Sequence, residues 1–504
     1  MVVGIAILCV VNQRSGHDWG DDFALYIRQG KSIVDGNVHQ VLDDNKFTVA
    51  NSSWHTFSPN SYPWGWPLLI APLYAIWGLD FAVLKQFEAV LFAVFLFTWF
   101  RVVARRSTER AALLLVLMLG MSVAYVGWTD TALSEFPYLA FLGITLWWID
   151  RCRTRGAFET GRLWPLALAG VLAAYTYSIR REGMALFAAI GMVHLAALVR
   201  SAATERSVVR VLKSAPWKRI ATPYAAGVGF VVGLQLLLPS VLFQRYPDAG
   251  LKQMKPNIIW FRDILAEQIG LKDQGADHFD LLGSDGLAKF VLGVFVTLAV
   301  LGLVMRIATA LETDAPIIGY TVLVVLIIGV QPFHEGRYLM SITPMMAYFA
   351  YQAIAVGVRI RRGWRADTGR NVGRVLAGLF IGLFVVANAT DLYRRTQTRI
   401  DTGDYIVWGP EDPAARALFA EIRAHTEPDA VIGFFRARAM NLYSDHRSVQ
   451  VTTLDDVLAD SDYYAMEKNS DYSQVLLLDS DAEAAGMQKV WENDHFILWK
   501  VNRT

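Results

Sequence analysis

Long apolar blocks alternate with short polar connections along most of the chain. The blocks lie near residues 1–11, 67–100, 111–128, 132–149, 164–179, 183–199, 221–241, 287–305, 316–331, 338–357 and 374–390. Most are long enough to cross a bilayer core of about 30 Å as helices, and the block at 67–100 fits one long element or two short ones. The block at 1–11 is too short to span, so either its helix begins abruptly at Met1 or the start lies elsewhere. The pattern predicts an α-helical polytopic membrane protein with about 11 transmembrane helices.

Basic residues are sorted between alternate connections of these helices. One set carries Arg101, Arg105, Arg106 and Arg110, then Arg151, Arg153, Arg155 and Arg162, then the stretches 200–219 and 359–374. The other set is nearly free of Lys and Arg, apart from Arg180, Arg181 and Arg337. Because cytoplasmic loops are enriched in Lys and Arg, we expect the loop 12–66, the loop 242–286 and the tail 391–504 to face the extracytoplasmic side of the cell (plasma or inner) membrane.

The tail differs in composition from the rest of the chain. It holds 20 Asp and Glu against 12 Lys and Arg, and its apolar residues come in short runs. The segment 412–426, with Pro at its start, indicates an amphipathic helix. The runs 430–435, 474–479 and 495–501 indicate strands. We therefore expect a transmembrane domain at 1–390, including the outward loop 12–66 with an interfacial helix, and a small soluble α/β domain at 391–504.

Composition agrees with the membrane assignment and narrows the function. Hydrophobic residues make up 54% of the 504 positions and charged residues 18%, against about 45–50% and 25% in soluble domains. Cys9 and Cys152 fall in different predicted spans, so no disulfide framework is expected. The sequence contains no P-loop, no G-x-G-x-x-G after a strand, no H-E-x-x-H and no C-x-x-C. Nothing in it indicates a nucleotide site or a nucleic-acid partner.

Two adjacent aspartates begin the most informative segment, "GDDFALY". From Asp22 onward, apolar residues recur at helical spacing until Gly36, which predicts an amphipathic interfacial helix. A carboxylate at the helix start favours the dipole, and this capping interpretation explains one aspartate. Two neighbouring charges at a low-dielectric boundary repel, so one pKa should be raised. We therefore predict a catalytic role for Asp21 or Asp22, and favour Asp22.

The same outward loop is rich in aromatic residues. It holds Trp54, His55, Tyr62 and Trp64, the last two within "SYPWGWPLLIAPLY". Such rings suit contact with a sugar or an isoprenoid chain. An aromatic belt at the membrane interface explains them equally well.

Three short outward turns place charges against apolar spans. They are "WTDTALSEFPYL" with Asp130 and Glu135, "SIRREGMAL" with Arg180, Arg181 and Glu182, and "QPFHEGRYLMSITP" with His334, Glu335, Arg337 and Tyr338. Charges at this depth are costly and by default mark function. For the first two turns, ion pairs that only fix helix ends are an equal alternative. For Arg337 we favour a phosphate ligand, because an outward Arg breaks the charge pattern and guanidinium binds phosphate bidentately.

A further basic turn lies in the tail, "FFRARAMNLYSDHRSV" at 434–449, directly after a predicted strand. It could touch an anionic substrate. A solvated turn of the α/β domain is the interpretation we favour.

The order of these motifs resembles the integral-membrane GT-C glycosyltransferases, in the branch of the lipid A aminoarabinose transferase and the protein O-mannosyltransferases. The resemblance rests on "GDDFALY" after a single span, "YPWGWPLLIAP" before the next, and "SEFPY", "RREG" and "GRYLMSITP" in outward turns. A small outward domain after the last span also fits. The chain has Asp-Asp where the family usually has Asp-Glu, so either aspartate can occupy the catalytic position.

The resemblance implies inverting transfer of a sugar from a polyprenyl-phosphate or polyprenyl-diphosphate carrier to a lipid, glycan or protein acceptor on the outer face. It assigns catalysis to Asp22 or Asp21, and donor phosphate binding to Arg337, Tyr338, Arg180 and Arg181. The expected substrate cavity comprises Tyr26, Trp54, His55, Tyr62, Trp64, Asp130, Glu135, Glu182, His334 and Glu335. No cofactor is required, although the aspartate pair could bind a divalent cation.

Two other functions stay open. A flippase or transporter of lipid-linked glycans would show internal repeats and a site near the midplane, whereas the charges here crowd one face. A glycan polymerase or ligase would use a large outward loop, and 242–286 is long enough.

Overall fold

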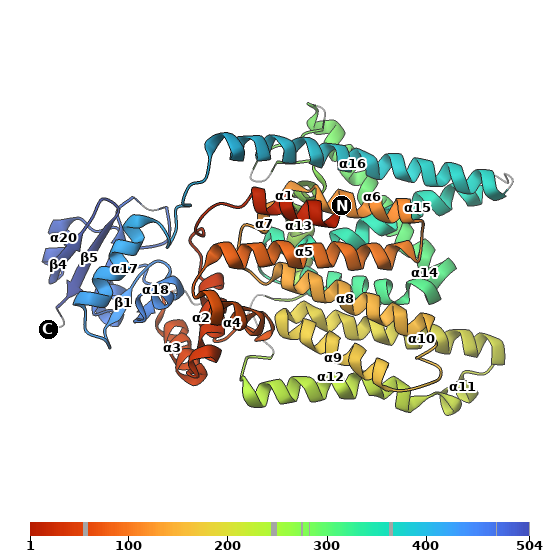
Figure 1. Ribbon diagram of the computed structural model, residues 1–504, viewed down its shortest axis with the longest axis horizontal. Helices are drawn as coiled ribbons and strands as arrows, with labels where there is room; N and C mark the ends of the chain where they lie inside the picture. The colour runs from red at the N-terminus through yellow and green to blue at the C-terminus, as the bar shows by residue number, and fades with distance from the viewer. Residues whose placement is uncertain are drawn as a thin grey trace.

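The computed structural model describes residues 1–53, 59–242, 249–273, 276–281, 283–361, 366–469 and 471–502. Long helices run side by side in a bundle, and a domain containing a β-sheet lies beyond one end of it (Figure 1). We call this end of the bundle the sheet end and the opposite end the far end.

Twelve α-helices of the described ranges correspond to the apolar blocks of the sequence. They are α1 (Val2–Val11), α4 (Gly65–Trp77), α5 (Phe81–Ala104), α6 (Glu109–Gly120), α7 (Val123–Trp128), α8 (Glu135–Thr154), α9 (Trp164–Ile179), α10 (Ala185–Glu205), α12 (Trp217–Leu237), α14 (Asp285–Gly329), α15 (Thr343–Arg361) and α16 (Ala366–Thr402). Within the same ranges, five helical stretches are both long and apolar enough to cross a membrane. One of them, α14, contains two predicted spans and bends at Ala310.

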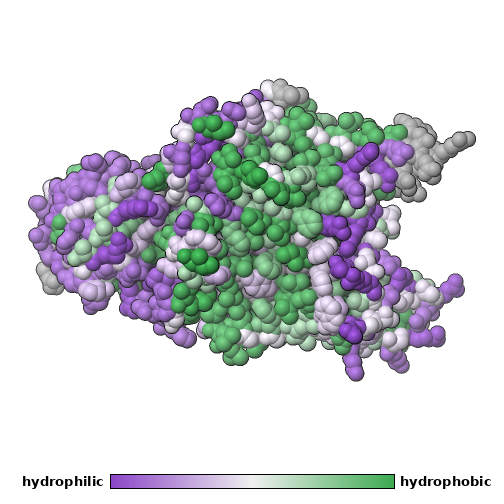
Figure 2. Space-filling model, in the orientation of Figure 1, coloured by the Kyte–Doolittle hydropathy of each residue, from purple (hydrophilic) through white to green (hydrophobic). Residues whose placement is uncertain are grey.

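The surface of the bundle matches this assignment. On the face seen in Figure 2, apolar residues form a broad band across the helices, between a polar sheet end and a polar far end. Leu236 and Leu237 of α12, 80% and 78% exposed, belong to this apolar surface, and an exposed apolar area of such extent is typical of a membrane-facing one. The prediction of a polytopic helical membrane protein with a small C-terminal α/β unit is confirmed.

The apolar block at 67–100 forms two helices. Gly78 ends α4 with a positive φ of 68°, and the side chain of Asp80 caps α5 by accepting from the backbone N–H groups of Ala82 and Val83. Left-handed glycine and an aspartate N-cap are standard stop and start signals. The apolar block is therefore interrupted between these two residues, and α4 stays short.

Shorter elements gather at the sheet end and carry most of the motifs. They are α2 (Asp22–Asp35), α3 (Val38–Asn51), η1 (Arg181–Met184), η2 (Leu251–Gln253), α13 (Met254–Ile269) and η3 (Gly336–Ser341), while α11 (Val208–Ser214) follows α10. The helix predicted from Asp22 is confirmed, and Gly36 ends it with a φ of 72°. One face of α2 packs against α4, so α2 lies on the bundle itself.

The C-terminal domain has a five-stranded sheet in the order β2-β1-β3-β5-β4. Its elements are α17 (Pro413–His425), β1 (Val431–Gly433), α18 (Ala437–Ser444), β2 (Arg447–Val449), α19 (Leu454–Asp460), β3 (Tyr463–Glu467), α20 (Asp479–Ala484), β4 (Met487–Glu492) and β5 (Phe496–Val501). Strands β2, β1 and β3 are parallel, and β5 is antiparallel to β3 and β4. Helix α16 continues past residue 390 to Thr402 before this domain begins.

The predicted helix at 412–426 and the strands at 430–435 and 495–501 are confirmed. The predicted strand at 474–479 is wrong, because this run is irregular and Leu476 and Leu478 are 57% and 71% exposed. The edge position belongs to β4, which pairs with β5 as its neighbour in sequence. A continuous apolar run alone does not distinguish a strand from a packed loop.

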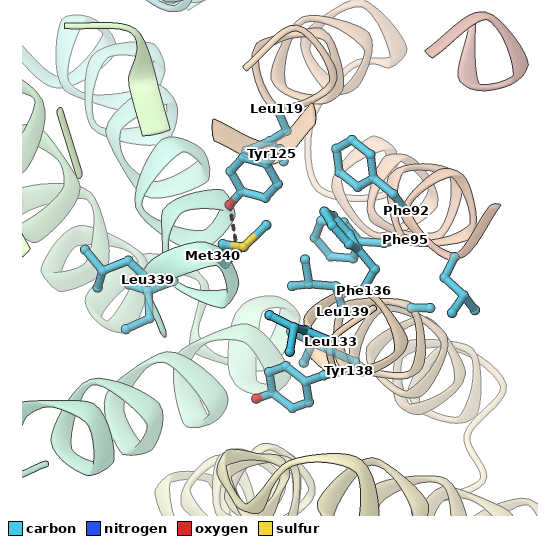
Figure 3. Packing of buried hydrophobic residues seen from close by; sticks show 14 of the residues in the cluster. Phe92, Phe95, Leu119, Tyr125, Leu133, Phe136, Tyr138, Leu139, Leu339 and Met340 are labelled. Carbon is cyan, nitrogen blue, oxygen red and sulfur yellow. Dashed lines mark hydrogen bonds between the residues drawn. The ribbon is translucent and has the colours of Figure 1, made fainter. Parts of the chain in front are cut away.

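A buried cluster at the sheet end holds the turn η3 in place. The Tyr125 hydroxyl on α7 donates a hydrogen bond of 2.6 Å to the carbonyl of Met340, and Figure 3 shows these groups facing each other among Phe92, Phe136 and Leu139. Met340 is 1% exposed. A buried carbonyl needs such a donor, so the core fixes the turn that carries Arg337.

We expect Tyr125→Phe to lower the unfolding midpoint in detergent, because a buried unpaired carbonyl costs about 1–3 kcal/mol. Amide hydrogen exchange should rise in η3 and not in α4. Tyr175→Phe is the matched control, since it removes a hydroxyl that bonds Gly65 of α4. Equal exchange in η3 in both variants would contradict the anchoring role.

Candidate active site

A pocket of about 430 Å³ opens where the bundle meets the C-terminal domain. It is bounded by α2, the segment before α4, the α9–η1 turn, the end of α14, η3 and the C-terminal domain. The described residues that line it are Asp21, Asp22, Tyr26, Pro59, Tyr62, Pro63, Ile179, Arg180, Arg181, Glu182, Ile327, Ile328, Gln331, Phe333, Glu335, Arg337, Tyr338, Arg436 and Gln450. Motifs separated by hundreds of residues therefore share one cavity.

Asp22 is held between two donors. One of its oxygens accepts from Arg337 Nη2 at 2.7 Å, and the other accepts from the Tyr62 hydroxyl at 2.5 Å. Burial alone would raise the pKa of Asp22, but Arg337 and the Tyr62 hydrogen bond outweigh it and hold that pKa below its usual range. Burial and Asp22 raise the pKa of Tyr62 well above its usual value, so the phenol keeps the proton that it donates.

Asp21 points toward the C-terminal domain. It occupies the N-cap position of α2, as the capping interpretation predicts, but its side chain makes no cap hydrogen bond and binds the C-terminal domain instead. Its Oδ1 accepts from the backbone N–H of Arg438 at 3.0 Å, and its Oδ2 lies 4.0 Å from Arg436 Nη1. Burial raises the pKa of Asp21, and Arg436 and Arg438 offset this only in part. The neighbouring carboxylates thus have opposite pKa shifts.

Two arginines converge opposite Asp22. The buried carboxylate of Glu135 on α8 pairs with Arg180 and lies 3.6 Å from Arg337 Nε. Glu182 Oε1 lies 3.3 Å from Arg180 Nη2. Both guanidinium groups also face the ring of Tyr338, at 5.4 and 5.9 Å from its centre. Carboxylates therefore compensate two closely spaced positive charges at the pocket wall.

Aromatic rings form the wall along α2. Tyr26 and Tyr62 stack with ring centres 4.4 Å apart, and the Tyr26 hydroxyl donates to Ser134 Oγ at 3.1 Å. Tyr62 reaches this position because Gln29 of α2 bonds both its backbone N–H and its carbonyl at 3.0 Å. Gly65 follows, where a Cβ would lie 2.6 Å from Ser178 O, so only glycine lets α4 begin against the end of α9.

Further predicted cavity residues complete the lining. Glu182 and Glu335 both border the pocket, and burial raises the pKa of Glu335. Arg181 borders it as well while donating to the carbonyl of Val241 at 2.7 Å. Glu135 lies behind Arg180 and Arg337, in a small adjoining space lined with Tyr138.

Three predicted cavity residues lie elsewhere. The described lining does not include Asp130, whose carboxylate is buried between Arg14 and Lys85. The indole of Trp64 is buried and donates to the carbonyl of Pro239, and His334 packs against Trp260 with ring centres 5.4 Å apart. For Asp130 the alternative of an ion pair that fixes a helix end matches the geometry. Trp54 and His55 lie outside the described residues.

The C-terminal domain contributes residues that the sequence analysis set aside. Arg436 and Gln450 line the pocket, and Arg438 is 2% exposed. The interpretation of 434–449 as a solvated turn is therefore wrong. One available signal was position, since the turn follows the carboxyl end of the parallel strand β1, where α/β domains bind ligands.

Comparison with solved structures relates this arrangement to known membrane proteins. ArnT from Cupriavidus metallidurans bound to undecaprenyl phosphate aligns with 99% of this chain and 97% of its own, at a TM-score of 0.54 and 11% identity. The oligosaccharyltransferase of Archaeoglobus fulgidus aligns with 92% of this chain and 69% of its own, at 0.51 and 12%. The chain has the GT-C fold. No family model and no curated protein matches the sequence.

The GT-C fold confirms the resemblance that the motifs indicated, at the level of architecture. The likeness to ArnT extends over the bundle and the C-terminal domain, because almost the whole chain aligns. Among the described residues, no group of three or more His, Cys, Asp or Glu side chains is placed to hold a metal ion.

The opposite pKa shifts predict opposite effects of two neutral substitutions on stability. A lowered carboxyl pKa stabilises the fold above the unfolded value, about 3.9, and that stability is lost as the pH falls through the folded pKa. A raised pKa destabilises the fold at neutral pH, and acid relieves this. At pH 7, Asp22→Asn should therefore lower the unfolding midpoint, and Asp21→Asn should leave it unchanged or raise it. Equal decreases in thermal unfolding would contradict the assignment.

Proposed function

We propose that this protein is an inverting glycosyltransferase that moves a sugar from a polyprenyl-phosphate or polyprenyl-diphosphate carrier to a lipid, glycan or protein acceptor at the outer face of the membrane. The proposal rests on one pocket. Its lining contains the carboxylate of Asp22, hydrogen-bonded to Arg337, together with the guanidinium group of Arg180. A base and an anion-binding pair at a membrane boundary are what transfer from a lipid phosphate needs.

The donor is proposed to bind on the bundle side of the pocket. Its phosphate takes the position next to Arg337, Arg180 and the Tyr338 hydroxyl, where guanidinium groups offer several parallel donors. The first isoprene units lie against Ile179 and the end of α14, which form an apolar wall beside these charges. Glu135 and Asp22 neutralise the arginines. The phosphate competes with these carboxylates for the guanidinium N–H donors.

The acceptor is proposed to enter from the side of the C-terminal domain. Arg436 and Gln450 form that wall. An acceptor placed there attacks the anomeric carbon from the face opposite the phosphate, with its hydroxyl within reach of Asp22. Attack in line with the departing phosphate inverts the configuration at that carbon.

The proposed reaction needs no general acid. The acceptor oxygen attacks the anomeric carbon of the sugar and passes its proton to the Asp22 carboxylate. The bond from the anomeric carbon to the phosphate oxygen breaks, and its electron pair leaves with the polyprenyl phosphate. Arg337 and Arg180 stabilise the charge that develops on this leaving group. The phosphate is already a competent leaving group, so one base suffices and a second carboxylic acid, as in glycosidases, is not needed.

Position favours Asp22 over Asp21 as the base, because Asp22 contacts the arginine proposed to hold the phosphate. Its lowered pKa keeps it ionised but also makes it a weaker proton acceptor, so the assignment rests on its place in the pocket. Asp21 faces the C-terminal domain and has a raised pKa. Two related folds support a lipid phosphate as the donor class: the ArnT structure holds undecaprenyl phosphate, and an Archaeoglobus fulgidus AglB structure holds dolichol-phosphate and an inhibitory peptide.

We expect Asp22→Asn to lower kcat for sugar transfer in a reconstituted assay by about 10²–10⁴-fold, because the base is lost. Binding of polyprenyl phosphate should persist, and Asp21→Asn should retain more activity than Asp22→Asn. Full activity of both variants would refute the assignment. If purified protein in vesicles moves the lipid-linked sugar across the bilayer without transferring it, the flippase function holds instead.

Arg337→Ala should weaken binding of polyprenyl phosphate by roughly 10- to 100-fold, since it removes charge-assisted hydrogen bonds to the phosphate. Binding can be measured by the quenching of tryptophan fluorescence in detergent. Arg262→Ala is the control, because it removes an exposed arginine whose partner is Asp263. Unchanged affinity in Arg337→Ala would remove the phosphate-binding role.

A further inference from the structure

One arginine of the C-terminal domain reaches both members of the acidic pair without lining the pocket. Arg438 lies in the first turn of α18 and is 2% exposed. Its backbone N–H donates to Asp21, and its Nη1 lies 3.4 Å from the Tyr62 hydroxyl that donates to Asp22. Its guanidinium also faces the Tyr62 ring, 5.4 Å from the ring centre.

The rest of the guanidinium is fixed by groups of the membrane domain. Nε donates to Asn45 Oδ1 of α3 at 2.8 Å, and Nη2 donates to the carbonyl of Pro59 at 2.8 Å. Asn45 in turn donates to the carbonyl of Asn60 at 2.6 Å. A buried guanidinium is costly unless its donors are satisfied, and here they are satisfied only when α18 is docked on α2 and α3.

The hydrogen bonds run in one direction. The Tyr62 oxygen accepts from Arg438 and its proton is donated to Asp22, so the arginine fixes which way the phenol points. Arg438 also adds positive charge near both carboxylates and lowers the pKa of each. We propose that Arg438 is a positioning residue, through which docking of the C-terminal domain sets the geometry and the ionisation of the Asp21–Asp22 pair. This inference rests on the proposed function, because Asp22 is the base only in that reaction.

Docking itself does not depend on Arg438. Thr48 donates to the carbonyl of Ser448 at 2.8 Å, and the backbone N–H of Ser53 donates to the carbonyl of Gln450 at 2.8 Å. Arg447 forms an ion pair of 2.9 Å with Asp44 in the same interface. Loss of the Arg438 side chain should therefore leave the domain docked, and Arg447→Met provides a matched interface control.

Several other charged groups face the pair and stay unchanged in these variants. Asp22 faces Arg337 of η3 and Tyr62, and it also acts on Glu335 in front of η3. Asp21 faces Arg436, and the charge of Asp22 raises the pKa of Asp21 further. Replacing Arg438 therefore removes one positive charge near the pair and leaves the other charged groups around it unchanged.

The test compares full-length Arg438→Met, Arg438→Lys and Arg447→Met in a reconstituted transfer assay with a polyprenyl-phosphate sugar. Activity needs the ionised base, so it falls as the pH drops through the carboxyl pKa. Loss of a nearby positive charge raises that pKa, and the acidic limb of the kcat/KM profile should move to higher pH in Arg438→Met, by about one unit. Its kcat at the optimum should fall roughly tenfold, with donor KM little changed.

Arg438→Lys keeps the positive charge but loses the planar guanidinium with its several fixed donors. The acidic limb of its kcat/KM profile should therefore match wild type, while its kcat should be only partly retained. Arg447→Met should match wild type in both measures. If Arg438→Met lowers activity while its acidic limb stays in place, the residue is merely structural and the inference is overturned. Hydrogen exchange across α3 and α18 confirms in each variant that the domain is docked.

The two proposals fail in distinguishable ways. If wild type transfers no sugar, the proposed function fails, and the effect of Arg438 on the pair is then read from the unfolding midpoint as a function of pH. In that measurement, Arg438→Met should lose stability at a higher pH than wild type. Coincident profiles for wild type and Arg438→Met would overturn the inference independently of catalysis.

Discussion

The ion pair between Asp22 and Arg337 is the interaction on which the pocket depends. It joins side chains 315 positions apart at 2.7 Å, one on α2 and one on η3. Charges this close to an apolar bundle persist only if each has a partner, so both elements must be held firmly. The hydrogen bond from Tyr125 to Met340 anchors η3, and packing on α4 anchors α2. The core of the bundle thus fixes the distance between a base and an anion-binding group.

The remaining charges of the pocket are arranged around that pair. Glu135 serves Arg180 and Arg337 together, which lets two positive charges lie side by side at the pocket wall. A phosphate that binds there replaces carboxylate oxygens at guanidinium donors that already converge on one wall. On the other side, Arg436 and Arg438 bring positive charge from the C-terminal domain to Asp21. The acidic pair therefore lies between a basic group of the bundle and a basic group of the domain, and this asymmetry separates the two carboxyl pKa values.

Local signals predicted much of this arrangement. The spacing of apolar residues after Asp22 and the stop at Gly36 predicted α2, and the charged turns at 178–186 and 331–344 supplied Arg180, Arg337 and Tyr338 to one cavity. The errors have a common cause. A charged residue next to a membrane span can belong to a functional site or to an ion pair that only fixes a helix end. Asp130 belongs to an ion pair, and only the positions of Arg14 and Lys85 in the structure show this. The run at 474–479 has the apolar composition of a strand. Whether it joins the sheet depends on which segment pairs with β5 at the sheet edge, and that segment is β4.

By itself, the sequence determined the helical membrane class, the bounds of helix α2 and the grouping of the charged turns at one end, because these follow from hydropathy and from residues close in the chain. Only the tertiary structure decided that Asp22 and Asp21 have different partners, that Arg436 lines the pocket, and that Arg438 is buried beside the acidic pair rather than lying in a solvated turn. Those facts depend on docking of α18 against α2 and α3, some 400 residues apart in the chain. Contacts between residues so far apart in the chain leave no periodic or local pattern in the sequence. Whether such a contact forms depends on how the two complete surfaces fit together.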